Sequence, residues 1–132
     1  MGIADTGFLV AFANARDVHH DWAVSVARRV SPPCLTCEAV LAEAAFHLTS
    51  VALVLAMIED GFIRLAFDAA SHLERLAELA SKYGDLSPDL ADLCLVRMSE
   101  LFPRHSVITV DRTEFGVYRR NKRDVIPIVC PP

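Results

Sequence analysis

The chain has 132 residues, of which 53% are apolar, and its mean hydropathy is +0.33. These values predict one domain over residues 1–132 with a sizeable core, and they exclude a disordered chain. The net charge of -4 argues against a protein that attracts nucleic acid by its overall charge alone. No secretory leader opens the chain, and the uncharged run from Ala44 to Ile58 is shorter than the ~18 residues of a membrane span. We therefore expect a soluble protein of the cytoplasm that has no contact with a membrane.

Short apolar segments alternate with helical patterns in the first half of the chain. The pair Pro32-Pro33 must end the preceding helix, Ser50 is a suitable N-cap, and Gly61 is a suitable stop. On these signals we expect strands at 3–5 and 34–36, and helices at 7–13, 19–30, 37–48 and 50–61.

The second half repeats this alternation. We expect a strand at 62–67, and an amphipathic helix at 68–84 that Gly84 ends. A further helix is expected to start at Ser87, as cap, with Pro88 in its first turn, and to run to Leu101. The β-branched run "SVITV" at 106–110 predicts a buried strand, and "VIPIV" at 125–129 predicts an edge strand because of its proline. This order predicts an α/β fold with a mostly parallel sheet.

Four acidic residues stand in surroundings that are otherwise apolar. Asp5 is the last residue of the first predicted strand and is the only charge between Met1 and Ala15. Asp111 directly follows the strand at 106–110. Glu43 and Asp92 are lone charges in apolar helices. An ionised carboxylate removed from water costs several kcal/mol unless something pairs with it.

A shared cation would explain all four positions. Ligands in open α/β sheets bind outside the carboxyl ends of the strands, where Asp5 and Asp111 are expected to lie. Glu43 and Asp92 would lean over the same edge from helices. Oxygen-only ligands select hard cations, so Mg²⁺ or Mn²⁺ fits, and such sites serve phosphate chemistry. For each acid taken alone, a helix cap or an ion pair with an arginine is an equally good interpretation.

Histidines and a fifth acid lie close to these positions in the sequence. Asp89 precedes Asp92 by one helical turn, so it either faces the same cleft or favours the helix dipole in the first turn. His47 lies one turn after Glu43 and either reaches the cleft or is a core histidine. The cluster from Asp17 to Asp21 is interpreted as an exposed helix start, because adjacent side chains on a helix point apart.

Basic residues and cysteines give weaker signals. Six of the thirteen basic residues lie between Arg104 and Arg123, either as a solvated tail or as phosphate contacts. Cys34 and Cys37 form a CxxC where a strand meets a helix, which allows thiol redox chemistry. Reduced, buried cysteines are the better interpretation for these and for Cys94 and Cys130.

Four segments together resemble a known family. "ADTGFLVAF", "CEAVLAEAAFHL", "SPDLADLCLVRMSE" and "ITVDRTEFGVYR" occur in the order of the signature segments of PIN domains, in particular of VapC-type toxins and their small single-domain relatives. The resemblance spans nearly the whole chain. It implies a three-layer α/β/α sandwich that cuts RNA with Mg²⁺ or Mn²⁺.

The resemblance also assigns roles to individual residues. Asp5, Glu43, Asp92 and Asp111 match the metal-binding acids of the family, and Thr109 matches the hydroxyl residue of its TxD motif. If this is a ribonuclease, RNA phosphates would contact the arginines that follow Asp111, namely Arg112, Arg119, Arg120 and Arg123. An antitoxin partner and a homodimer are further expectations from the family. The alternative is a PIN-like interaction module without catalysis.

Overall fold

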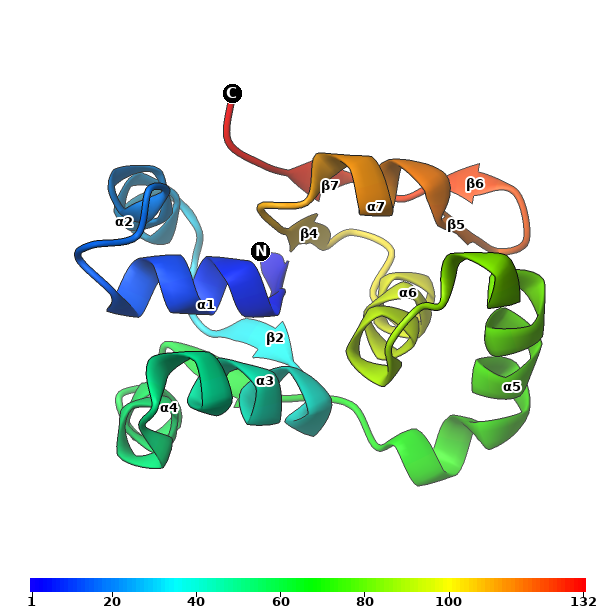
Figure 1. The fold of residues 1–132 in the computed structure, drawn as a ribbon, viewed down its shortest axis with the longest axis horizontal. Helices are drawn as coiled ribbons and strands as arrows, with labels where there is room; N and C mark the ends of the chain where they lie inside the picture. The colour runs from blue at the N-terminus through cyan, green and yellow to red at the C-terminus, as the bar shows by residue number, and fades with distance from the viewer.

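The computed structural model describes all residues, 1–132, as an α/β/α sandwich around one parallel sheet (Figure 1). The sheet has five strands in the order β3-β2-β1-β4-β7, and every pair in it is parallel. Its strands are β1 (Gly2–Ala4), β2 (Cys34–Thr36), β3 (Ile63–Leu65), β4 (Ser106–Ile108) and β7 (Ile128–Val129). The predicted fold class is therefore confirmed.

Helices connect the strands, as parallel pairing requires. The connections from β1 through β2 to β3 contain α1 (Thr6–Ala13), α2 (His20–Arg29), α3 (Glu38–Leu48) and α4 (Val51–Glu59). The connections from β3 through β4 to β7 contain α5 (Leu73–Lys82), α6 (Leu90–Leu101) and α7 (Arg112–Val117). In Figure 1, α6 lies in the middle of the molecule, with α1 on one side and α5 on the other.

Local sequence signals account for most of these boundaries. The side chain of Ser50 accepts a hydrogen bond from the Leu53 amide and caps α4 as predicted. The strand β2 begins directly after Pro33 and has the predicted bounds. Of the strand predicted at 125–129, only Ile128–Val129 joins the sheet, as β7, because Pro127 interrupts the segment. This strand lies at the edge of the sheet, as the proline indicated.

The segment before α6 differs from its prediction. Ser87 does not cap the helix, because it has a left-handed backbone with a φ of 48°. Asp89 is the N-cap instead, and its side chain accepts a hydrogen bond from the Asp92 amide. Gly84 does not end the preceding helix either: α5 ends at Lys82, and Gly84 begins a 3₁₀ turn, η2 (Gly84–Leu86). A carboxylate accepts a capping bond better than a hydroxyl, so Asp89 competes successfully for this position.

Three short elements were missed by the sequence analysis. A 3₁₀ turn, η1 (Ala69–His72), occupies the start of the predicted helix at 68–84. The helix α7 follows Asp111, and the hairpin of β5 (Arg119–Arg120) and β6 (Asp124–Val125) follows α7. These elements are too short for a hydrophobic period to be visible in the sequence.

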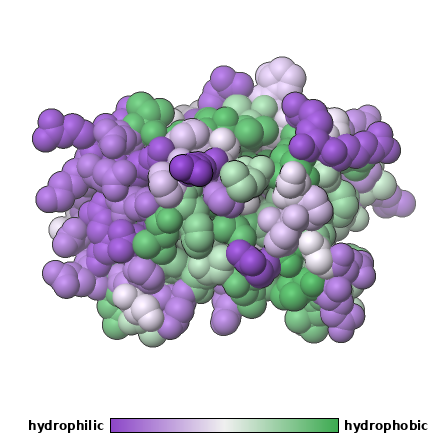
Figure 2. Space-filling view, turned by 180° about the vertical axis from the view of Figure 1, so that it is seen from behind, coloured by the Kyte–Doolittle hydropathy of each residue, from purple (hydrophilic) through white to green (hydrophobic).

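The core lies between the sheet and its helices. Its largest fully buried side chains include Phe8, Phe115 and Tyr118. Seen from behind, hydrophobic side chains cross the middle of the surface and hydrophilic ones gather on the side where α5 lies (Figure 2). No helix combines the length and the apolar character needed to cross a lipid bilayer.

The strand order reverses its direction between β1 and β4. From β1 the chain moves outward through β2 to β3, then returns across the sheet to β4 on the other side of β1. Such a point leaves a crevice at the carboxyl ends of the two strands, and ligands of open α/β sheets bind there. Asp5 directly follows β1, and two residues separate Asp111 from the end of β4.

Candidate metal site

A pocket of about 500 Å³ lies at this crevice, and its lining is acidic. Seven carboxylates line it, together with two histidines and no lysine or arginine. None of the seven takes part in a salt bridge anywhere in the structure. The carboxylates are those of Asp5, Asp17, Glu43, Asp89, Asp92, Asp111 and Glu114. All four predicted metal-binding acids are thus brought together, although the sequence places them up to a hundred residues apart.

Asp5 and Asp111 are held by their positions at helix starts. Asp5 is the N-cap of α1, and its Oδ1 accepts the Thr6 amide at 2.6 Å. Asp111 is the N-cap of α7, and its Oδ1 accepts the Glu114 amide at 2.8 Å. Both carboxylates therefore lie at the positive ends of helix dipoles, which offsets part of their mutual repulsion.

Thr109 joins these two acids. Its hydroxyl donates to Asp5 Oδ2 at 2.7 Å and accepts the Asp111 amide at 3.0 Å, and the residue is fully buried. The threonine that the family resemblance singled out therefore fixes the rotamer of one acid and the backbone of the other.

Gly7 allows the first turn of α1 to come close to the segment after β4. A Cβ at this position would lie 2.3 Å from Val110 Cγ2, which is closer than real carbon atoms approach each other. A larger residue would therefore force the Val110 side chain or the start of α1 to shift.

Glu43 and Asp92 reach the pocket from helices α3 and α6. The Thr6 hydroxyl donates to Glu43 Oε2 at 2.9 Å. The buried Tyr118 hydroxyl donates to Asp92 Oδ2 at 3.2 Å. Neither acid is a helix N-cap, so the requirement for caps does not explain why these two carboxylates face the pocket.

Three further acids, Asp17, Asp89 and Glu114, complete the group of seven. Asp89 caps the start of α6 and also lines the pocket, so a place at the helix start and a place in the cleft do not exclude each other. Glu114 was missed by the sequence analysis, because its role depends on the helix α7, which was not predicted. Asp17, His19 and His47 also line the pocket, although the Asp17–Asp21 cluster was interpreted as an exposed helix start. A signal for Glu114 did exist, namely its position three residues after Asp111, one helical turn away.

Burial raises the pKa of several of these carboxyls. It raises the pKa of Asp5 to about 6, against the opposing effect of the hydrogen bonds from Thr109 and Thr6. Burial, followed by the charge of Asp89, raises the pKa of Asp92. The pKa of Glu114 rises to about 8 because of burial and of its neighbours Asp111 and Asp92. As long as no cation is present, Glu114 therefore retains its proton near neutral pH, and Asp5 does so below about pH 6.

The residues present fit a hard divalent cation. All the acidic donors are oxygens, they have no basic partner in the pocket, and burial together with neighbouring acids raises the pKa of Asp5 and of Glu114. The side chains as they stand do not form a group of three or more His, Cys, Asp or Glu with the spacing of a metal site. Mg²⁺ is commonly held by one or two carboxylates together with water and substrate phosphates, so the donor set suits Mg²⁺ or Mn²⁺ better than zinc.

The predicted RNA-binding arginines lie outside the pocket and have structural contacts. Arg119 donates to the carbonyls that end α7, and Arg112 donates to the Pro131 carbonyl at 3.2 Å. Arg120 donates to the carbonyls of Ser99 and Pro103, at 3.0 and 3.2 Å. The exposed Arg123 makes no such contact.

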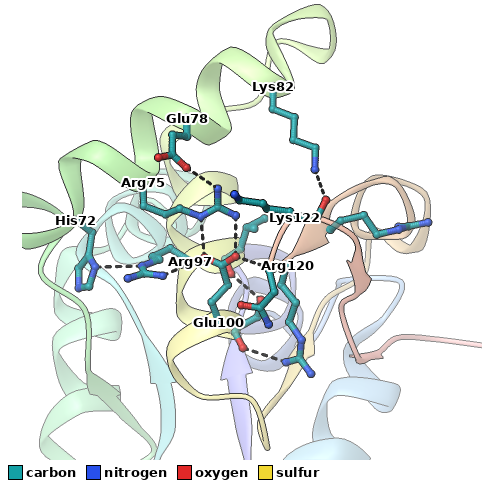
Figure 3. A network of polar contacts seen from close by, with 12 residues as sticks. His72, Arg75, Glu78, Lys82, Arg97, Glu100, Arg120 and Lys122 are labelled. Atoms are coloured by element: carbon teal, nitrogen blue, oxygen red, sulfur yellow. Dashed lines mark hydrogen bonds and ion pairs between the residues drawn. The ribbon is translucent and has the colours of Figure 1, made fainter.

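The hairpin that carries Arg119 and Arg120 is fixed to α5 and α6 by a charged network. Figure 3 shows Arg75 and Arg97 converging on Glu100, with Arg120 and Lys122 of the hairpin beside them. The Arg75 guanidinium contacts both Glu100 oxygens, at 2.7 and 3.0 Å, and the side chain of Glu100 is only 3% exposed. The Asn121 amide in the hairpin also donates to Glu100, at 2.5 Å, and this bond connects the hairpin to the network.

The chain was compared with known proteins. No family model matches it, and no curated protein matches it either. The site is therefore interpreted from its own geometry and chemistry.

We expect Thr109→Val to destabilise the protein by about 2–3 kcal/mol near neutral pH. Valine keeps the shape of the side chain but leaves an oxygen of Asp5 and the amide of Asp111 without their partner. Thr109→Ser restores the hydroxyl and should stay within ~1 kcal/mol of the original protein. Urea unfolding of the three proteins measures the difference. Equal stability of the valine and serine variants would contradict this role of the hydroxyl.

Proposed function

We propose that the protein is a metal-dependent ribonuclease of the PIN type that hydrolyses RNA phosphodiester bonds with Mg²⁺ or Mn²⁺. The single observation that carries the proposal is the pocket at the carboxyl ends of β1 and β4, where seven carboxylates meet without a lysine or arginine. Helix caps explain Asp5, Asp89 and Asp111, but they do not explain Glu43, Asp92 and Glu114. Carboxylates that share a pocket without basic partners repel one another, and this repulsion destabilises the folded protein unless a cation binds there.

In this proposal the acidic residues of the pocket have different roles in holding the ion. Asp5 and Asp92 would hold the ion, because they are the two buried acids and each has one oxygen fixed by a hydroxyl, from Thr109 and Tyr118. Asp111 and Glu43 lie around them and complete the ligand set directly or through water. When bound, such an ion lowers the pKa of a coordinated water and neutralises charge on the phosphate.

Glu114 is suited to move a proton. Its pKa of about 8 means that the metal-free protein carries a proton on this side chain near neutral pH. It lies between Asp92 and Asp111, whose charges contribute to this shift. A carboxyl of this kind donates a proton to a leaving oxygen or accepts one from water, according to its state.

Cleavage of RNA tests the proposal directly. The purified protein is incubated with a mixed RNA pool in Mg²⁺, in Mn²⁺, and in excess chelator. We expect cleavage with either ion and none with the chelator, and the metal titration of the protein without RNA should show saturable binding. Saturable metal binding without cleavage of any RNA would favour the interaction module, and the absence of both would reject the proposal.

Arg123 is the arginine best placed to contact RNA, since it is exposed and free of structural contacts. We expect Arg123→Ala to weaken RNA binding and to reduce the slope of log affinity against log salt by about 1, with stability unchanged within ~0.5 kcal/mol. Arg120→Ala should instead cost about 1–2 kcal/mol of stability, because it removes the bonds to the Ser99 and Pro103 carbonyls. Filter binding at several salt concentrations, with urea unfolding of both variants, separates the two effects. The opposite pattern would contradict this division.

The resemblance to VapC-type toxins adds an antitoxin partner, a homodimer and a cytoplasmic location to the proposal. Four large apolar side chains are exposed on α3 and α4, which supports a partner surface: Phe46 is 78% exposed, Val51 63%, Leu53 45% and Leu55 53%. The same surface supports the alternative of an interaction module. Metal-dependent cleavage distinguishes the two functions, since only the nuclease requires it.

A further inference from the structure

Two thiols that are far apart in the sequence lie on one cavity of the structure. Cys37 is the N-cap of α3, and Cys94 lies in the second turn of α6. Both are buried, with exposed fractions of 2% and 1%, and both line a mostly apolar cavity of about 530 Å³. The two side chains lie close enough for Cys94 to be the main influence on the pKa of Cys37. Two neighbouring thiols on one cavity wall can be joined by a disulfide.

The CxxC motif does not supply this pair. Cys34 lies on β2, in the sheet, and is not among the residues that line the cavity. Cys130, near the end of the chain, is not among them either. The thiol partner of Cys37 is therefore Cys94 and not the nearby Cys34.

We propose that Cys37 and Cys94 are a redox modification site, at which a peroxide oxidises the two thiols to a reversible disulfide between α3 and α6. The Cys37 sulfur attacks one peroxide oxygen, the O–O bond breaks, and Cys37 becomes a sulfenic acid while water leaves. The Cys94 sulfur then attacks the Cys37 sulfur. The S–S bond forms, the S–O bond breaks, and a second water leaves. Two thiols are oxidised and one hydrogen peroxide is reduced, and a dithiol reverses the change by exchange.

The surroundings of Cys37 favour it as the attacking thiol. Cys94 lowers the pKa of Cys37 against the opposing effect of burial, and the amides of Val40 and Ala39 at the start of α3 add to the lowering. Thiols at helix N-termini are the usual nucleophiles of this chemistry. The cavity gives a small peroxide access to the sulfur, past Glu38 and Asp68 on its wall.

The disulfide would connect two helices that both reach the acidic pocket. Glu43 follows Cys37 on α3, and Asp92 precedes Cys94 on α6 by two residues. The link closes a long loop, and such a link raises the melting temperature by roughly 5–15 °C in a domain of this size. This inference does not depend on ribonuclease activity.

Peptide mapping of the Cys34→Ser variant tests the site. In this variant the tryptic peptide 30–64 contains Cys37 as its only cysteine, and the peptide 83–97 contains only Cys94. The folded protein is treated with hydrogen peroxide, its free thiols are blocked, and it is digested without reductant. We expect the two peptides joined, lighter than their sum by two hydrogens, and separated again by a dithiol.

Two further proteins make the result decisive. Cys130→Ser should form the same link, whereas Cys94→Ser should not. The original protein is mapped as well, by fragmentation of the linked peptides, so that the test does not depend on the folding of any variant. A link between Cys34 and Cys37 in the original protein, or separate oxidation of Cys37 and Cys94 without a link, would overturn the proposal.

Discussion

Asp92→Asn is expected to lower the rate of metal-dependent RNA cleavage by roughly a thousandfold, with the fold intact. Asp92 is buried on α6, and the Tyr118 hydroxyl holds one of its oxygens. Asparagine has nearly the same shape but carries no charge, so it removes the electrostatic part of cation binding. Multiple-turnover cleavage of a labelled RNA in Mg²⁺ measures the rate.

Stability should change in the opposite direction in the absence of metal. Burial and the charge of Asp89 raise the pKa of Asp92, so the ionised side chain is unfavourable in the metal-free protein. Asp92→Asn should therefore unfold at a denaturant concentration equal to or higher than the original protein in the presence of a chelator. This result would show that the loss of cleavage is not a loss of folding.

Asp85→Asn is the matched control. Asp85 is an exposed acid in η2, just before α6, and it does not line the pocket. The same change of charge at this position should leave cleavage within a factor of two or so. If Asp92→Asn cleaves as fast as Asp85→Asn, Asp92 is not part of the site, and a contaminating nuclease becomes the explanation of any activity.

The metal-free protein is expected to lose stability as the pH rises from about 4 to about 8. Burial raises the pKa of Asp5 from 3.8 to about 6, so in this range the folded protein holds a proton that the unfolded chain has released. Stability falls wherever the folded state binds more protons than the unfolded state. The loss from Asp5 is complete above about pH 6 and corresponds to about 3 kcal/mol.

Glu114 extends this decline to higher pH, because its pKa is raised to about 8 by burial and by Asp111 and Asp92. Added Mg²⁺ should oppose the decline. A cation binds the ionised carboxylates, so its stabilising effect is expected to grow with pH in the range where the protons leave. Urea unfolding near pH 4.5 and near pH 8, each with chelator and with Mg²⁺, gives the four free energies of unfolding that are compared.

Asp5→Asn is the variant that isolates the contribution of Asp5. Without the buried charge, the metal-free variant should be more stable than the original protein near pH 8 by about 1–3 kcal/mol, and it should gain less from Mg²⁺. The amide has one acceptor fewer for the Thr109 hydroxyl, which offsets part of the gain. If Asp5→Asn is less stable than the original protein near pH 8 in chelator, the buried charge of Asp5 does not destabilise the metal-free protein.

Much of the fold was accessible from the sequence because its signals are local. The β-branched run before Asp111 and the apolar segment that ends at Asp5 predicted two strands, and the structure places these side by side in the sheet. The cap at Ser50 was predicted correctly for the same reason, since a side-chain hydroxyl and an amide three residues later are sufficient to form it. At Ser87 the same kind of signal failed, because Asp89 offered a stronger cap two residues further on.

The sequence by itself determined an α/β protein and marked four acids, since a charge in an apolar segment is visible without a structure. Only the tertiary structure decided which groups surround them. Glu114 lines the pocket and the Tyr118 hydroxyl contacts Asp92 because α7 and the residue after it come close to α6, and Cys37 and Cys94 share a cavity because α3 and α6 pack together. Contacts of this kind depend on the packing of segments that are distant in the sequence, and no local pattern encodes the partner of a side chain across such a distance.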